Sequence, residues 1–183
     1  MSYTPLQIPE TKPATEFIDG CLVQKMSPLG LHARVQAAVA IALGTWSDER
    51  GRGRVGPEWD YDLTPPGGST NRLVPDVAYL SYDRVAYENE AAAQVPTVAP
   101  NVAVEILSQG QNLANSQRRI DIFLACGAEL VILIDPRAEE AWLVDANGTA
   151  HLTRDDTIVH SALPDFSLPL RRCLELVPPG GRR

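Results

Sequence analysis

The chain has 183 residues, of which 44% are hydrophobic and 21% charged, so it can build the core of a globular domain and is neither disordered nor collagen-like. Its 16 basic and 23 acidic side chains give a net charge of −7, which disfavours tight, salt-driven binding to nucleic acid. The longest apolar runs are too short to span a membrane and no secretory signal opens the chain, so we expect a cytoplasmic protein without membrane contact.

Composition predicts one domain between two irregular ends. Residues 1–15 contain three prolines and are interpreted as a flexible N-terminal arm. Residues 177–183, with the sequence VPPGGRR, are interpreted as a disordered C-terminal tail. No repeat, linker or change of composition separates parts of the sequence between them, so we predict a single domain over residues 16–176.

The first half of this domain alternates between strand and helix patterns. A strand or hairpin is expected over residues 18–26, with a turn at Gly20. Apolar residues at helical spacing predict a helix over residues 29–46, which the Arg-Gly segment at 50–56 interrupts. A strand is expected over residues 55–63, followed by a Pro- and Gly-rich loop.

The second half contains longer apolar runs. Residues 73–81 and 101–107 are apolar at nearly every position, which is typical of strands buried on both faces. A loop with a short helix is expected between them, over residues 82–99. A helix over residues 112–126 is predicted to stop at Gly127, in the left-handed conformation.

A third buried strand and a hairpin complete the predicted sheet. The strand covers residues 129–135, and the dipeptide Asn147-Gly148 predicts a tight turn between strands at 141–145 and 149–153. This order of elements indicates an α/β domain with a mixed central β-sheet flanked by helices and a C-terminal β-hairpin.

Two carboxylates interrupt strands that we expect to be buried. Asp76 follows Pro75, and Glu105 lies within the apolar run at 101–107. A buried carboxylate is costly unless it is paired or binds a metal ion, and two on adjacent strands would suit Mg²⁺ or Mn²⁺. The alternative is that one or both lie at strand ends and face water.

The helix that follows Glu105 has a polar N-terminal half where an apolar inward stripe is expected. Arg119 lies four residues before Phe123 and so shares its face, which would aim a cation at the two carboxylates. On pattern alone, Arg119 could equally extend to water over Phe123.

These motifs together resemble the Uma2 family, which belongs to the PD-(D/E)XK nuclease superfamily. The resemblance covers residues 16–175 and is carried by PDVAYLS at 75–81, VAVEILS at 102–108, ILIDP at 132–136, FIDGCLVQKMSPLGLHARVQ at 17–36 and LPDFSLPL at 163–170. It implies a restriction-endonuclease-like fold and a metal-dependent endonuclease that hydrolyses the phosphodiester bonds of nucleic acid, with DNA as the expected substrate. A homodimer is also expected, since cutting both strands of a duplex favours two sites.

The resemblance also implies roles for individual residues. Asp76 and Glu105 match the acidic metal ligands, and the backbone carbonyl of Ile106 could add a third oxygen to a Mg²⁺ or Mn²⁺ ion. The superfamily has a lysine two residues after the glutamate, where this chain has Leu107. Family members usually carry the lysine on the next helix, at the position of Arg119 here, so Arg119 is the third catalytic candidate.

The missing lysine leaves a second function open. Arginine can stabilise phosphate charge but cannot act as a base near neutral pH. Lys25 is the one lysine within residues 16–176, and it reaches the site only if the first strand passes nearby. The rival hypothesis is a nuclease-fold protein that has lost catalysis and acts as a binding or regulatory module.

Three further features rank lower. His32 falls in line with Val35 and Val39, and we interpret it as a core histidine somewhat more readily than as a site residue. Glu16, just before the first strand, could supply a further carboxylate to the site, but we prefer to interpret it as a solvated carboxylate at the start of the domain. The arginines between residues 50 and 54 form the densest positive patch in the sequence, which is more often a solvated turn than a phosphate contact.

Overall fold

The structure is a computed structural model that describes residues 6–175. Its central sheet has six strands in the order β10-β9-β8-β7-β6-β3. In that order the strands are β10 (Gly148–Thr153), β9 (Glu140–Asp145), β8 (Leu130–Asp135), β7 (Val102–Ile106), β6 (Val77–Ser81) and β3 (Gly53–Pro57). Strands β7 and β8 are parallel and the other neighbours are antiparallel, so the predicted mixed sheet is confirmed.

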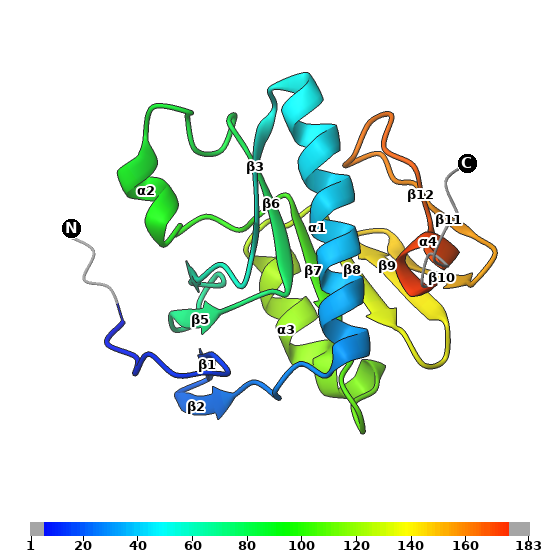
Figure 1. Ribbon diagram of the computed structural model, residues 1–183. Coiled ribbons are helices and arrows are strands. Elements are labelled where there is room, and N and C mark those ends of the chain that lie inside the picture. Colours follow the sequence, from blue (N-terminus) through cyan, green and yellow to red (C-terminus); the bar gives the residue numbers. More distant parts are fainter. Residues whose placement is uncertain (1–5, 176–183) are drawn as a thin grey trace.

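Two helices cover opposite faces of this sheet (Figure 1). Helix α1 (Gly30–Arg50) packs Val35, Val39 and Leu43 with one set of strand residues, and α3 (Leu113–Ala125) packs Ile120 and Phe123 with the other. Successive strand residues point to opposite faces, so Val104 joins the cluster under α1 and Ala103 the cluster under α3. This double burial explains the continuous apolar runs.

The ends of both helices follow from local sequence. Helix α1 runs four residues past its predicted end and stops where Gly51 adopts a left-handed conformation with φ of 56°. Helix α3 begins after Asn112, whose side chain accepts a hydrogen bond from the backbone N–H of Asn115. Gly127, with φ of 96°, follows α3 as predicted.

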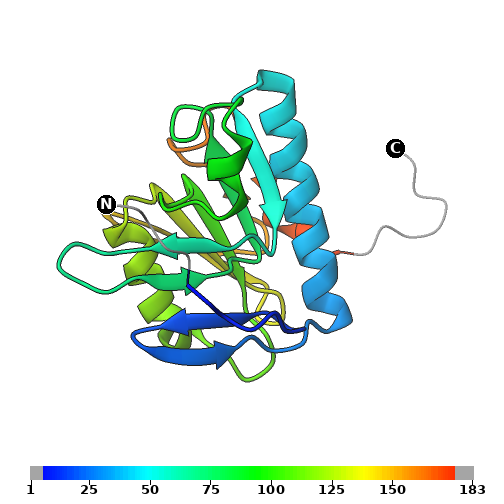
Figure 2. The ribbon, with the colours of Figure 1, turned by 90° about the vertical axis from the view of Figure 1, so that its left-hand side faces the viewer.

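A second sheet of four short strands lies beside the central sheet, and its two blue N-terminal strands lie at the lower edge of the molecule in Figure 2. Its strands, in the order β2-β1-β5-β4, are β2 (Cys21–Gln24), β1 (Thr15–Ile18), β5 (Asn71–Leu73) and β4 (Tyr61–Leu63). The hairpin of β1 and β2 pairs with β5 at Phe17 and Arg72. That pairing brings the N-terminal hairpin next to the segment that leads into β6.

The prediction of one strand over residues 73–81 is wrong. The segment forms β5 and β6, which belong to different sheets, with residues 74–76 between them. Pro75 has no N–H to donate to a ladder, so it favours a break at this point. Asp76 therefore lies directly before β6 rather than inside a strand. The strand expected over residues 55–63 is likewise divided, into β3 and β4.

The remaining elements are short. Helix α2 (Glu90–Gln94) is the short helix expected in the loop before β7, and β9 with β10 forms the predicted hairpin. Strands β11 (Thr157–Ile158) and β12 (Leu168–Pro169) and helix α4 (Leu170–Leu174) were not predicted. No helix within residues 6–175 is long and apolar enough to cross a membrane. The predicted tail at 177–183 lies outside the described residues, and the domain boundaries stay predictions.

One close backbone contact gives a stability prediction. A Cβ at Gly53, the first residue of β3, would lie 2.4 Å from the carbonyl oxygen of Leu80. We expect Gly53→Ala to lower the free energy of unfolding by about 1–3 kcal/mol, because the strands would have to move apart. A Cβ at Gly44 in α1 meets nothing within 4 Å, so Gly44→Ala should raise the free energy of unfolding by up to about 1 kcal/mol. Urea titration of both variants tests this pair, and equal shifts in the same direction would contradict it.

Candidate functional site

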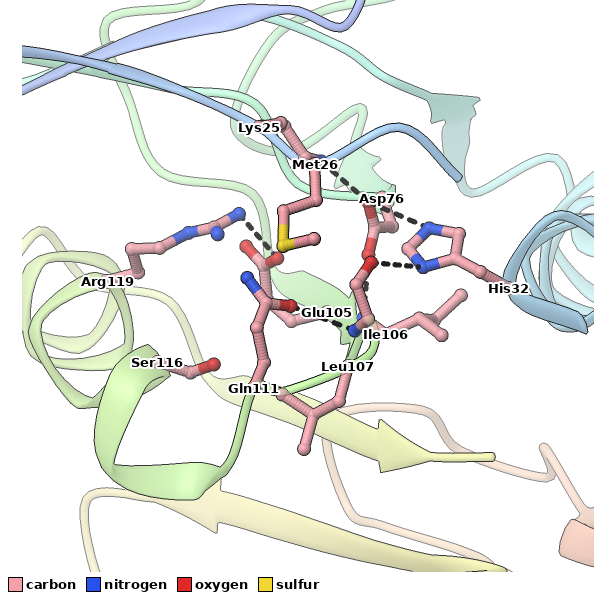
Figure 3. Close-up of a pocket in the computed structure, with 11 residues that line it drawn as sticks. Lys25, Met26, His32, Asp76, Glu105, Ile106, Leu107, Gln111, Ser116 and Arg119 are labelled. Atoms are coloured by element: carbon pink, nitrogen blue, oxygen red, sulfur yellow. Dashed lines mark hydrogen bonds and ion pairs between the residues drawn. The ribbon is translucent and has the colours of Figure 1, made fainter. Parts of the chain in front are cut away.

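A small polar pocket lies where the start of β6, the end of β7, and helices α1 and α3 converge (Figure 3). The segment that follows β2 covers it from the side of the second sheet. Side chains from distant parts of the sequence point into this pocket or toward one another around it. Its lining residues are Lys25, Met26, His32, Asp76, Glu105, Ile106, Leu107, Ser108, Gln111, Ser116 and Arg119.

Strand pairing places the two predicted carboxylates side by side. Val77 pairs with Val104 in the antiparallel ladder, so Asp76 lies opposite Glu105. Asp76 is 1% exposed and Glu105 is 4% exposed, so neither faces water. The backbone N–H of Ile106 donates a 2.6 Å hydrogen bond to Asp76 Oδ2. The role of the Ile106 carbonyl as a metal ligand stays a prediction.

Asp76 is held as an anion by its neighbours. Lys25 Nζ lies 2.6 Å from Asp76 Oδ1, and His32 Nε2 lies 3.5 Å from the same oxygen. Burial would raise the pKa of Asp76, but the hydrogen bond from His32 and the charge of Lys25 outweigh it, so the pKa lies well below its ordinary value. Asp76 is therefore ionised at neutral pH.

Lys25 supplies a lysine to a site whose expected lysine positions hold Leu107 and Arg119. It directly follows β2, and its ammonium group also donates to the carbonyl oxygen of Val74 at 2.8 Å. Burial would lower the pKa of Lys25, but the charges of Asp76 and Glu105 outweigh burial and raise it. Lys25 is therefore a protonated, fixed donor in this arrangement.

Glu105 is paired on one oxygen and unpaired on the other. Arg119 Nη2 donates to Glu105 Oε2, which places Arg119 at the carboxylates rather than in water. Glu105 Oε1 is buried and has no hydrogen-bond partner within the described residues. Burial raises the pKa of Glu105 to about 8, against the opposing charge of Arg119. A buried carboxyl oxygen without a partner leaves this position available to a ligand.

Glu16 is a third buried carboxylate, and its interpretation as a solvated residue is wrong. It is 1% exposed, accepts a 2.9 Å hydrogen bond from the N–H of Val74, and lies 3.3 Å from Arg119 Nη2. Burial raises its pKa. The sequence offered one weak signal for this placement: Glu16 directly precedes the apolar residues Phe17 and Ile18. Its role in the structure is to fix Arg119 between two carboxylates.

Helix α1 contributes two side chains to the Asp76 segment. His32 lies in the pocket wall and contacts both Asp76 and, at 3.4 Å, the hydroxyl of Ser108, so it is a site residue rather than only a core histidine. Gln36 lies one turn further along α1 and donates a 2.9 Å hydrogen bond to the carbonyl oxygen of Asp76. Gln36 was missed from the sequence because nothing local distinguishes it from a surface glutamine.

The arginines between residues 50 and 54 do not reach this pocket. Arg54 donates to the backbone carbonyls of Val85, Ala86 and Tyr87 and pairs with Glu90, so it fixes the loop before α2. Arg50 lies against Trp46 on α1. Arg50 and Arg54 therefore both have partners within the protein and do not need a phosphate ligand.

The donor set fits a hard divalent cation. Within residues 6–175, no group of three or more His, Cys, Asp or Glu side chains is arranged to hold a metal ion. An ion bound by Asp76 and Glu105 would complete its shell with water and phosphate oxygens, which is the usual arrangement for Mg²⁺. The unpaired Oε1 of Glu105 is the oxygen that would be free to bind such an ion.

Comparison with known proteins agrees with this fold. No curated protein matches the chain. A putative nuclease belonging to DUF820 from Anabaena variabilis ATCC 29413 is 24% identical, with 91% of this chain and 93% of that chain covered and a TM-score of 0.80, so the two share a fold. A DrdV–DNA complex is 20% identical over 79% of this chain and 12% of that chain, with a TM-score of 0.41.

The family assignment comes from a match along most of the sequence. The model of the Uma2 family, whose description is "Putative restriction endonuclease", matches residues 3–171. This range includes every residue of the pocket and every strand of the central sheet. The resemblance carried by the motifs around Asp76 and Glu105 is thereby confirmed, and the chain belongs to the Uma2 family.

Proposed function

We propose that this chain is a metal-dependent endonuclease that hydrolyses phosphodiester bonds in DNA. The observation that carries the proposal is the pair of buried carboxylates on adjacent strands, Asp76 and Glu105, with an unpaired oxygen on Glu105. Mg²⁺ or Mn²⁺ bound there would stabilise charge on the phosphate and assist ionisation of the attacking water. The description of the Uma2 family supports the reaction class.

The side chains around the carboxylates have complementary roles in this proposal. Asp76 and Glu105 would hold the cation, and the N–H of Ile106 fixes the carboxylate of Asp76. Lys25, protonated and anchored on the carbonyl of Val74, donates to a phosphate oxygen or to the attacking water. Arg119, fixed between Glu105 and Glu16, stabilises negative charge on the phosphate.

The charge of the chain shapes how a substrate would bind. A net charge of −7 gives little long-range attraction for DNA, so substrate affinity depends on contacts at the site and on a bound cation. We therefore expect weak binding that a partner protein could assist. A homodimer with one site for each strand of a duplex stays a prediction of the same model.

Removing divalent cations tests the proposed reaction. We expect plasmid and single-stranded DNA to be cleaved in Mg²⁺ or Mn²⁺ and cleavage to fall to background in EDTA, because the carboxylates alone cannot stabilise phosphate charge. Readdition of Mn²⁺ to the chelated sample should restore cleavage, and gel electrophoresis measures each arm. Cleavage that persists in EDTA would contradict metal dependence, whereas binding without cleavage in every metal would favour the rival binding module.

A further inference from the structure

Three polar groups in the wall of the pocket have no partner. Ser116 in the first turns of α3 is 6% exposed, and its hydroxyl makes no hydrogen bond within residues 6–175. The Nε of Arg119 is buried and also unpartnered. Gln111 accepts a hydrogen bond from the N–H of Ser108 with its Oε1, which directs its Nε2 away from that backbone and leaves it unpaired. Figure 3 shows Ser116 and Gln111 extending toward the carboxylates.

These groups share one chemical property, which is that each can donate a hydrogen bond. The Nε of Arg119 is buried without a partner among the described residues, which costs free energy, and Ser116, which is 6% exposed, carries an unpaired hydroxyl. Together with the free amide of the half-buried Gln111, these donors favour a ligand over packing. Donors that converge beside the N-terminal end of a helix favour an anion, because the helix dipole adds partial positive charge there. The ligand chemistry that fits is an oxyanion.

The pocket is large enough for a single oxygen atom of a ligand but too small for a whole nucleobase. The space inside it is about 20 Å³, which holds one group the size of a water molecule or a single oxygen. Met26, which is 51% exposed, extends its thioether into the mouth of the pocket (Figure 3). An unbranched methionine changes rotamer at little cost, so a phosphate could approach and insert one oxygen.

We propose that Ser116 and Gln111, with the Nε of Arg119, form a subsite for a nonbridging phosphate oxygen of the DNA strand. The inference rests on the proposed function, since it assigns the phosphate contact within the same pocket. Asp76, Glu105 and Glu16 repel an anion, but Lys25 and Arg119 lie between them and offset that charge. The subsite donors lie on the α3 side, opposite the Lys25–Asp76 pair (Figure 3).

A matched pair of charge variants tests the role of Gln111. Gln111→Glu keeps the oxygen that accepts from Ser108 and replaces the free amide with a negatively charged oxygen. Gln109→Glu adds the same charge to an exposed residue of the same loop. We expect Gln111→Glu to weaken binding of a fluorescein-labelled single-stranded DNA by more than about tenfold in anisotropy titrations with Ca²⁺, and Gln109→Glu by less than about twofold.

Ser116→Ala separates a binding role from a structural role. Alanine removes an unpaired hydroxyl from a helix, so we expect the unfolding temperature to stay the same or rise. The same variant should weaken DNA binding and raise KM by about tenfold. A structural role would instead lower the unfolding temperature.

The outcomes distinguish this subsite from the proposed function. Equal effects of Gln111→Glu and Gln109→Glu, with unchanged binding by Ser116→Ala, would overturn the subsite even if the native protein cleaves DNA. If the native protein binds DNA but does not cleave it, and Ser116→Ala and Gln111→Glu still weaken binding selectively, the phosphate subsite is supported and the proposed catalysis fails.

Discussion

Glu105→Gln and Asp76→Asn should each reduce DNA cleavage by at least about a thousandfold. Both substitutions keep the size of the side chain and remove the negative charge that would hold the divalent cation, a contribution of several kcal/mol to the transition state. Glu105→Gln is the cleaner variant, because the Oε1 that it alters has no hydrogen-bond partner in the described residues. The rate of plasmid nicking in Mn²⁺ measures the effect.

The two variants differ in their expected stability. Asp76 accepts from Lys25 and from the N–H of Ile106, so Asp76→Asn leaves a buried ammonium group without its nearest counter-charge. Glu105 prefers to be protonated at neutral pH because burial raises its pKa to about 8 in the absence of a cation, so the neutral glutamine should be tolerated. Far-UV circular dichroism must show that Glu105→Gln is folded, and cleavage at the native rate by that folded protein would remove the metal assignment.

Much of the central fold could be predicted from local sequence. The apolar runs of β7 and β8 are unmistakable because both faces of these strands are covered, and Asn147-Gly148 defines the β9–β10 hairpin. The break at Pro75 was missed because apolar residues precede Pro75 and resume directly after Asp76. Strands β11 and β12 have two residues each and carry no periodicity that a sequence pattern can detect.

Some residues of the site could be identified from the local sequence, whereas the positions of others depend on contacts between distant segments. Glu105 could be identified because it interrupts an apolar strand, and Asp76 because it lies within a longer apolar run. Arg119 could be identified from the helix face that it shares with Phe123 and from the family resemblance. The positions of Lys25 and Glu16 depend on pairing between β1 and β5, more than 50 residues apart in the chain. No local pattern encodes that pairing. The sequence alone could therefore say only that Lys25 reaches the site if the first strands pass close to it.

Lys25→Met should lower kcat by at least about a hundredfold and should also lower the free energy of unfolding, because buried Asp76 loses its nearest counter-charge; kcat is therefore compared for protein that circular dichroism shows to be folded. Lys25 Nζ lies 2.6 Å from Asp76 Oδ1 and is the lysine nearest to the carboxylates, so its loss removes a fixed positive donor from the position where phosphate charge develops. Lys12→Met is the matched control, because it removes the same charge from an exposed residue of the N-terminal segment. We expect Lys12→Met to change kcat by less than about twofold in the same cleavage assay.

Arg119→Lys completes this test, because it places a lysine at the helix position where the family resemblance led us to expect one. Arg119 contacts Glu105 and Glu16 with one guanidinium group, and a lysine ammonium at that position is a single point donor. If Lys25 already performs the lysine's role, a second lysine at position 119 adds no catalytic group. Arg119→Lys should then lower kcat by about tenfold, because the guanidinium contacts with Glu105 and Glu16 are lost. An increase in cleavage by Arg119→Lys, together with a native rate for Lys25→Met, would instead show that the active site is degraded at position 119 and that Lys25 only neutralises Asp76.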